Sequence, residues 1–137
     1  MALANIENQE LVLVQFGHWP TFHDAEIVSI FFERAEPGYW PVISLILDTI
    51  GGFNKATATA ARHCLIELQF IGVQDHELAG FNHQNVVFSI DSAQEDDLIS
   101  CVIEPCNGVS GYIEAERVIV KRVMALPDGG LQRPEHD

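Results

Sequence analysis

The chain has 137 residues, of which 47% are apolar and 20% charged, and 20 acidic residues against 7 basic ones give a net charge of −13. This length fits a single domain, and the apolar share is too high for a disordered chain. No apolar run approaches the ~18 residues of a membrane-spanning helix, and the negative charge argues against nucleic acid as a ligand. No basic segment precedes Glu7 and Glu10, so we expect a cytoplasmic protein without a secretory signal.

One domain is expected over residues 1–126, because the composition changes only near the ends of the chain. The segment 127–137 opens with Pro127-Asp128-Gly129-Gly130 and has too few apolar residues to order itself. We therefore predict a flexible C-terminal tail over this segment.

Six segments show the alternation and the branched or aromatic content of β-strands. They cover residues 26–33, 40–50, 64–70, 85–91, 98–104 and 112–123. The last is expected to bend or bulge near Ala115-Glu116, and the turn sequence Glu36-Pro37-Gly38-Tyr39 predicts a hairpin between the first two. Alternation assigns these side chains to the core: Ile43, Leu45, Leu47, Cys64, Ile66, Leu68, Phe70, Val86, Phe88, Ile90, Ile99, Cys101 and Ile103.

Helical signals are weaker than strand signals. Residues 8–15 fit a short helix or an edge strand, and the alanine-rich segment 55–62 fits a short helix or a loop. The first two strands carry apolar side chains on both faces, which favours burial of both. The predicted fold class is mainly β, with α+β left open: antiparallel strands form a small sandwich or partly open barrel with one or two short helices.

The densest polar cluster, residues 17–26, contains two histidines and two carboxylates. Imidazole and carboxylate groups are ligands for zinc, manganese or iron, so a metal site is one hypothesis. Its spacing fits no compact metal signature such as HExxH. The residues that this hypothesis uses are His18, His23, Asp24, His76 and His83.

A structural interpretation of the same cluster gives each residue a role in folding. Asp24 closes a turn, His23 bonds a backbone carbonyl, and Trp19 and Phe22 are hydrophobic anchors. We favour this interpretation and expect no metal and no cofactor.

The segment 80–85 is interpreted in the same way. Gly80-Phe81-Asn82 predicts a turn that inserts Phe81 into the core, with Asn82 and Asn85 tying the loop backbone.

No catalytic residue is predicted. The three cysteines, Cys64, Cys101 and Cys106, form no CxxC motif and are interpreted as structural thiols in a reducing compartment. The chain also lacks a GxSxG elbow and a phosphate-binding glycine loop.

Acidic and aromatic residues form the candidate binding surface. Tyr112, Glu114 and Glu116 would share one face of the last strand, and Tyr39 and Trp40 are further candidate anchors. Asp96 lies in a run of acids that would steer a partner. Such a surface attracts basic partners, and simple solubility is the alternative explanation.

Three blocks of the chain resemble the immunity protein 50 family. Residues 16–26 are similar to its W-P-x-F-H-D-A-E opening, residues 80–86 to its G-F-N-x-Q-N segment, and residues 108–115 to its G-x-x-G-x-x-x-A segment. The resemblance implies a protective partner in a polymorphic-toxin system that binds a cognate toxin and blocks its active surface. The matching motif positions, interpreted as structural, are Trp19, Pro20, Phe22, His23, Asp24, Phe81, Asn82 and Asn85.

Three functions therefore remain open. The first is a non-enzymatic acidic binding protein, immunity-like, that neutralises a basic toxin domain by occlusion and binds neither nucleic acid nor membrane. The second is a small metal-binding protein or metal-dependent enzyme built on His18, His23 and Asp24. The third is a structural homo-oligomer that buries its two-sided apolar strands against a copy of itself.

Overall fold

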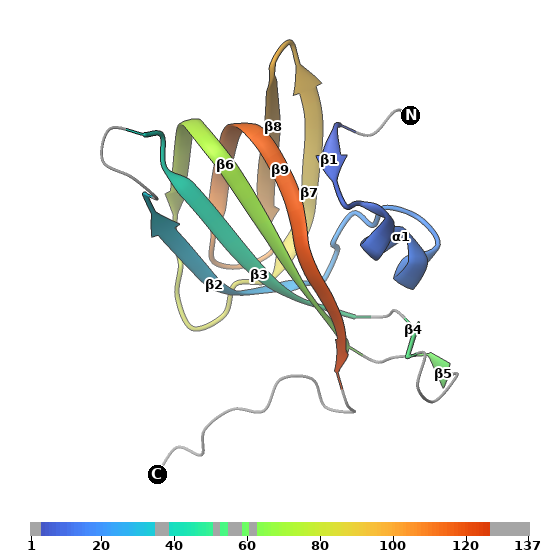
Figure 1. Cartoon of the computed structure of the whole chain (residues 1–137). Helices are drawn as coiled ribbons and strands as arrows, with labels where there is room; N and C mark the ends of the chain where they lie inside the picture. The colour runs from blue at the N-terminus through green and yellow to red at the C-terminus, as the bar shows by residue number, and fades with distance from the viewer. Residues whose placement is uncertain (1–3, 35–38, 51–52, 55–58, 61–62, 127–137) are drawn as a thin grey trace.

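A computed structural model describes residues 4–34, 39–50, 53–54, 59–60 and 63–126, and Figure 1 shows the elements along the chain. The predicted tail at 127–137, the turn residues 36–38 and most of segment 55–62 lie outside the described residues. The elements are β1 (Ile6–Glu7), α1 (Glu10–Phe16), β2 (Glu26–Glu33), β3 (Val42–Ile50), β4 (Phe53–Asn54), β5 (Thr59–Ala60), β6 (His63–Ala79), β7 (Val87–Glu95), β8 (Leu98–Pro105) and β9 (Ser110–Leu126).

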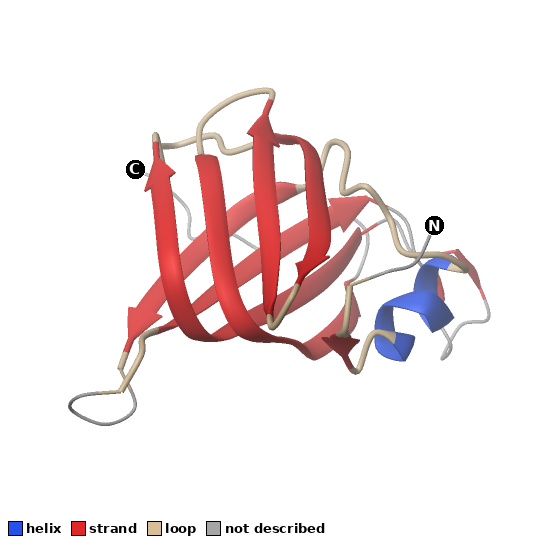
Figure 2. Cartoon of the chain, turned by 90° about the horizontal axis from the view of Figure 1, so that it is seen from above, coloured by secondary structure: helices blue, strands red, loops and turns tan. Residues whose placement is uncertain are grey.

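Most of the strands form one strongly curved sheet with the order β2-β3-β6-β9-β8-β7. All neighbours in this order are antiparallel, and β1 adds to β9 in parallel. The sheet curls until its two halves face each other (Figure 2). At the seam, Glu26 forms a bridge to Val86 and the Ile27 N–H donates to the Asn85 carbonyl at 2.9 Å. The strands β2 and β7 form no ladder with each other, so the sheet stays open.

This architecture confirms the predicted fold class, a mainly β protein with antiparallel strands and a short helix. The sequence left open a small sandwich and a partly open barrel. The single open sheet is closer to the partly open barrel. The predicted hairpin pairing of the first two strands is also present, because β2 and β3 pair antiparallel from Glu26↔Asp48 to Glu33↔Val42. β6 extends far beyond its predicted end at residue 70.

The helical alternative for residues 8–15 is correct, although the helix is displaced to Glu10–Phe16. It buries Val12 and ends at Gly17, whose φ of 78° lets its N–H donate to the Leu13 carbonyl at 2.7 Å. The preceding β1 places Ile6 beside Val118 of β9. The N-terminal segment is therefore attached to the sheet through the pairing of β1 with β9.

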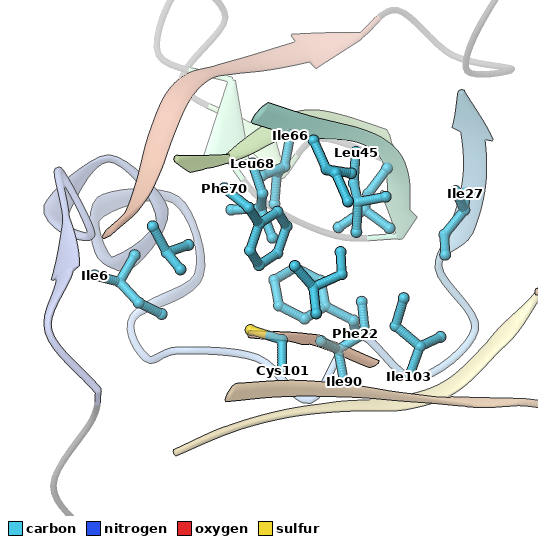
Figure 3. Packing of buried hydrophobic residues seen from close by; sticks show 14 of the residues in the cluster. Ile6, Phe22, Ile27, Leu45, Ile66, Leu68, Phe70, Ile90, Cys101 and Ile103 are labelled. Carbon is cyan, nitrogen blue, oxygen red and sulfur yellow. The ribbon is translucent and has the colours of Figure 1, made fainter. Parts of the chain in front are cut away.

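The concave side of the sheet encloses one hydrophobic core. The inward residues predicted for β3, β6 and β8 are all buried. Figure 3 shows Phe22, from the loop before β2, among Ile90, Cys101 and Ile103. Burial of a Leu, Ile or Phe side chain stabilises a fold by roughly 1.5–3 kcal/mol, so this core carries most of the favourable free energy of folding.

Two of the three inward residues predicted for β7 and its start, Val86 and Phe88, were wrong. Val87 and Ile90 point into the core, whereas Phe88 is 51% exposed and Val86 is only half-buried. The cause is a β-bulge: Val87 pairs with Pro105 and Ser89 pairs with Glu104, which leaves Phe88 as the extra residue. A bulge inserts one residue into the alternation and turns its side chain outward.

Two further bulges and a glycine bend the long central strands. Gln74 is the extra residue of β6 opposite Ala115 and Glu114, and Lys121 is the extra residue of β9. Gly72 has a φ of 70°, and the Glu116 side chain lies over it. The bulge expected in the last strand near residues 115–116 therefore lies in the neighbouring strand β6, and the bulge of β9 itself is at Lys121.

Gly111 provides a test of how closely β9 and β6 approach. Its φ is 141°, and a Cβ atom there would overlap the backbone carbonyl of Glu77. We expect Gly111→Ala to lower the free energy of unfolding by about 2–3 kcal/mol, from strain and the backbone overlap together. Urea denaturation followed by circular dichroism measures this loss.

The control is Gly17→Ala at the end of α1. Gly17 also has a positive φ, but a Cβ there would meet no atom within 4 Å. We expect it to lose only about 1 kcal/mol, from backbone strain alone. Equal losses in the two variants would contradict the proposed overlap.

Candidate functional site: an acidic face around Tyr112

The convex side of β6, β9 and β8 carries three carboxylates around one tyrosine. Asp75 pairs with Glu114, and Glu77 pairs with Tyr112, so the four side chains share one face of the sheet. On the next strand, Ser100 stands opposite Glu114 and Val102 opposite Tyr112. We call Asp75, Glu77, Tyr112, Glu114 and Val102 the acidic face.

The acidic face is a shallow hollow rather than a deep pocket. A depression of about 440 Å³ lies over Asp75, Tyr112, Glu114 and Val102. Asp75 and Glu77 are exposed, whereas Tyr112 and Glu114 are partly buried. The arrangement suits a docking surface for a convex partner.

One hydrogen bond fixes the centre of the acidic face. The Tyr112 hydroxyl donates to Asp75 Oδ2 at 2.9 Å. The hydrogen bond to Asp75 raises the pKa of Tyr112, and so do partial desolvation and the negative charges of Asp75, Glu77 and Glu114. Tyr112 is therefore held as a neutral donor, with its ring fixed among carboxylates.

The other predicted surface residues lie at two further places. Glu116 and Asp96 line a second hollow that also contains the ion pair in which Arg117 donates to Glu7 at 2.8 and 2.9 Å. Tyr39 and Trp40 are exposed just before β3. The carbonyl of Pro41, the next residue, accepts a hydrogen bond from Val73 N–H at 2.9 Å, so Trp40 lies near the β6 bulge that precedes Asp75.

Sequence reasoning missed Asp75 and Glu77, because it ended the strand at residue 70. Alternation continues beyond residue 70 and could have revealed them. Asp75 and Glu77 lie on one face of β6, and His76 and Leu78 lie on the other. The interruption at Gly72 and Gln74 hid this pattern.

The motif at residues 18–26 lies at the seam between β2 and β7. His23 Nδ1 is 3.0 Å from the Phe88 carbonyl, a contact of the kind that the structural interpretation predicts. Phe22 is buried and packs edge-to-face against Trp19, with ring centroids 5.7 Å apart. The Ala25 N–H donates to the Phe22 carbonyl at 3.0 Å and closes a tight turn. Pro20 is half-buried in the same segment.

The second motif holds its loop through asparagine side chains, but its phenylalanine is outside the core. Asn85 Oδ1 accepts the Asn82 N–H at 2.9 Å, and Asn85 Nδ2 donates to the Asn82 carbonyl at 2.8 Å. The prediction that Phe81 enters the core was wrong, because its side chain is 53% exposed. Gly80 has a φ of 86° and turns the chain so that Phe81 lies at the surface.

The structure does not bring the residues of the metal hypothesis together. Within the part of the chain that is described, no group of three or more His, Cys, Asp or Glu side chains is arranged to hold a metal ion. His23 lies near Asp24 at 3.6 Å, whereas His76 packs against Phe32 of β2. His18 follows α1, and His83 is exposed in the loop after β6.

The cysteines are all free thiols. Burial raises the pKa of Cys64 and that of Cys101 to about 11, so both remain protonated at neutral pH. Cys101 contacts the Ser92 hydroxyl at 3.1 Å inside the sheet. Cys106 is exposed after β8.

Comparison with known families places these features in context. The family model described as immunity protein 50 matches residues 8–126, which include all three blocks that resemble the family and every strand of the acidic face. The chain belongs to the immunity protein 50 family. No curated protein and no solved structure shows a significant match to it.

Membership gives this immunity protein 50 chain an immunity-like role, with a toxin as the general kind of partner. The family is generally non-enzymatic. The described residues contain no helix long and apolar enough to cross a membrane.

The charge environment of Tyr112 can be measured directly in this immunity protein. The chain has two tyrosines, so a Tyr39→Phe background leaves Tyr112 as the only titrating phenol. We expect Asp75→Asn in that background to lower the pKa of Tyr112 toward its ordinary value, because the variant removes both the hydrogen-bond acceptor and a nearby negative charge. Ultraviolet absorbance of the tyrosinate during an alkaline titration gives the shift.

The matched control is Glu10→Gln, which removes a carboxylate from α1, outside the acidic face. This variant is expected to leave the pKa of Tyr112 unchanged. A Tyr112 pKa that does not fall in Asp75→Asn would show that the hydroxyl–carboxylate contact is not formed in solution.

Proposed function

We propose that this protein neutralises a cognate toxin by binding a basic surface of that toxin on the acidic face and occluding it, without catalysis, in the cytoplasm. The observation that carries the proposal is family membership together with the gathering of three carboxylates around Tyr112 on one face. Inhibition by occlusion needs a rigid, complementary surface rather than a catalytic set.

Electrostatics favours a basic partner. Asp75, Glu77 and Glu114 repel one another while the surface is free, and an arriving Lys or Arg side chain relieves that repulsion. The whole chain reinforces the local field, since its net charge is −13. Such a field accelerates encounter with a cationic protein and repels polyanions.

The rigidity of the acidic face supports the same proposal. β9 lies between β6 and β8, and β8 lies between β9 and β7, so the strands that carry Tyr112, Glu114 and Val102 are paired on both sides there. Asp75 and Glu77 are held by their pairing with β9. Tyr112 is held by Asp75, so its ring needs little ordering when a partner binds. Tyrosine is also among the residues most often found to dominate binding energy at interfaces.

A charge reversal on the acidic face tests this proposal. The partner in this test is an inactive variant of the toxin domain that we expect the gene adjoining that of this protein to encode. We expect Glu114→Lys to weaken its binding by about tenfold or more at low salt, mainly through slower association. The cause is that the new lysine repels the cationic side chains of the partner. Surface plasmon resonance at two ionic strengths measures the effect and its screening.

The control is Glu10→Lys, which changes the net charge by the same amount in α1, away from the acidic face. At the higher ionic strength, about 0.1 M, its affinity is expected to change less than about threefold, since charges more than about 10 Å apart are then largely screened. If both reversals weaken binding equally, net charge rather than the acidic face attracts the partner. If neither does, the acidic face is not the binding surface.

A further inference from the structure

An apolar cleft lies between the free edge of β2 and the loop that follows β6. Its volume is about 370 Å³, enough for one or two apolar side chains. Apart from the loop glycine, its lining is entirely apolar and consists of Ile30, Phe32, Leu78, Ala79, Gly80, Phe81 and Val109. Two of the lining residues are phenylalanines that form opposite walls at the surface: Phe32 is 56% exposed and Phe81 is 53% exposed.

The loop that carries Phe81 is held in place by four local side-chain hydrogen bonds. Besides the Asn82–Asn85 pair already described, Asn82 Nδ2 donates to the Gly80 carbonyl at 2.8 Å and Asn82 Oδ1 accepts the Gln84 N–H at 2.9 Å. Gly80 packs directly on the Gly108 backbone. The loop is therefore preorganised around an exposed aromatic ring, which reduces the entropy lost when a partner covers it.

The neighbouring edge of β2 offers backbone groups as well. β2 pairs with β3 along one edge, and its other edge contacts Asn85 and Val86 only through Glu26 and Ile27. From Ser29 to Glu33, that edge meets no other strand in the described part of the chain. Val28 is the extra residue of a bulge in β2, but residues 29–32 beyond it include no charge and no proline, two of the usual protections of an exposed edge strand.

We propose that this cleft and the free edge of β2 bind an extended, cationic segment of the toxin, which adds to β2 as a strand and places apolar side chains between Phe32 and Phe81. The inference rests on the proposed function, because it assigns a second contact of the same partner. Addition of a strand to a sheet edge supplies backbone hydrogen bonds for affinity, and a neighbouring pocket supplies specificity.

Charge complementarity identifies the occupant. Glu33 follows Phe32 in β2, so its side chain points to the opposite face of that strand from the cleft. In a segment that alternates lysine or arginine with apolar residues and adds to β2, the apolar side chains enter the cleft and the cations lie on the face of Glu33. A second copy of the chain would bring acids against acids and a net charge of −13 against −13.

The decisive variant is Phe81→Ser, which removes one wall of the cleft and leaves the asparagine contacts of the loop in place. Its matched control is Phe88→Ser, because Phe88 is exposed to a similar extent, 51%, and lines no part of the cleft. With the inactive toxin domain of the adjoining gene, we expect Phe81→Ser to weaken binding by at least about 30-fold and Phe88→Ser by less than about threefold. Circular dichroism confirms that both variants fold.

A second measurement needs no variant and detects strand addition itself. Hydrogen exchange of the wild-type protein with and without the toxin domain should show slower exchange of the amides at residues 29–33 and 80–82 in the complex. Reduced exchange there, together with the selective loss in Phe81→Ser, supports the proposal.

The other results overturn it in distinguishable ways. If the wild-type complex forms but Phe81→Ser binds normally and residues 29–33 exchange as before, the cleft proposal fails while toxin binding stands. If the wild type does not bind the toxin domain, the proposed function fails and the cleft proposal fails with it. If sedimentation of the free protein shows a dimer that Phe81→Ser abolishes, the occupant is a second copy rather than a toxin segment.

Discussion

The pairing of β6 with β9 is the interaction on which the rest of the structure depends. These are the two longest strands, 17 residues each, and they pair from His63↔Leu126 to Ala79↔Ser110. Residues 63–71 of β6 also pair with β3, and residues 111–115 of β9 also pair with β8. A straight pair of this length would give a flat sheet with two exposed faces. The bend at Gly72 and the bulge at Gln74 instead curl the sheet around a single core.

The same bend accounts for the two surfaces at the far end of β6. Beyond Gly72, Asp75 and Glu77 point to the convex side, where they meet Tyr112 and Glu114 of β9. His76 and Leu78 point the other way, toward Phe32 and Ile30 of β2. One strand therefore presents a carboxylate-rich surface on one face and an apolar cleft on the other. A basic partner with apolar side chains could contact both across the width of a single strand.

Local patterning in the sequence was sufficient to predict most of the strands, but irregular backbone was not. The bounds of β2 followed from its branched and aromatic content despite a bulge at Val28. The inward residues of β3 and β8 followed from alternation, because the pairing of β3 with β6 and of β8 with β9 is regular. Phe88 was assigned to the core by alternation and Phe81 by its place in a predicted turn, and both are at the surface. A bulge displaces Phe88 and a glycine turn displaces Phe81. Neither event changes the composition of its segment, so only tertiary pairing reveals it. The partners Asp75 and Glu77 of Tyr112 were missed for the same reason.

The free protein carries two local arrangements that work against its own stability. Carboxylates gather around Tyr112, and the phenylalanine rings of Phe32 and Phe81 remain in water beside an edge strand without charged protection. By contrast, Arg117 and Arg122 are committed to Glu7 and Glu67 and neutralise neither surface. Self-repulsion and exposed apolar area are both relieved when a cationic, partly apolar surface binds. When a partner removes this repulsion and covers this apolar area, the free energy gained contributes to the affinity for that partner. Both surfaces are therefore suited to binding.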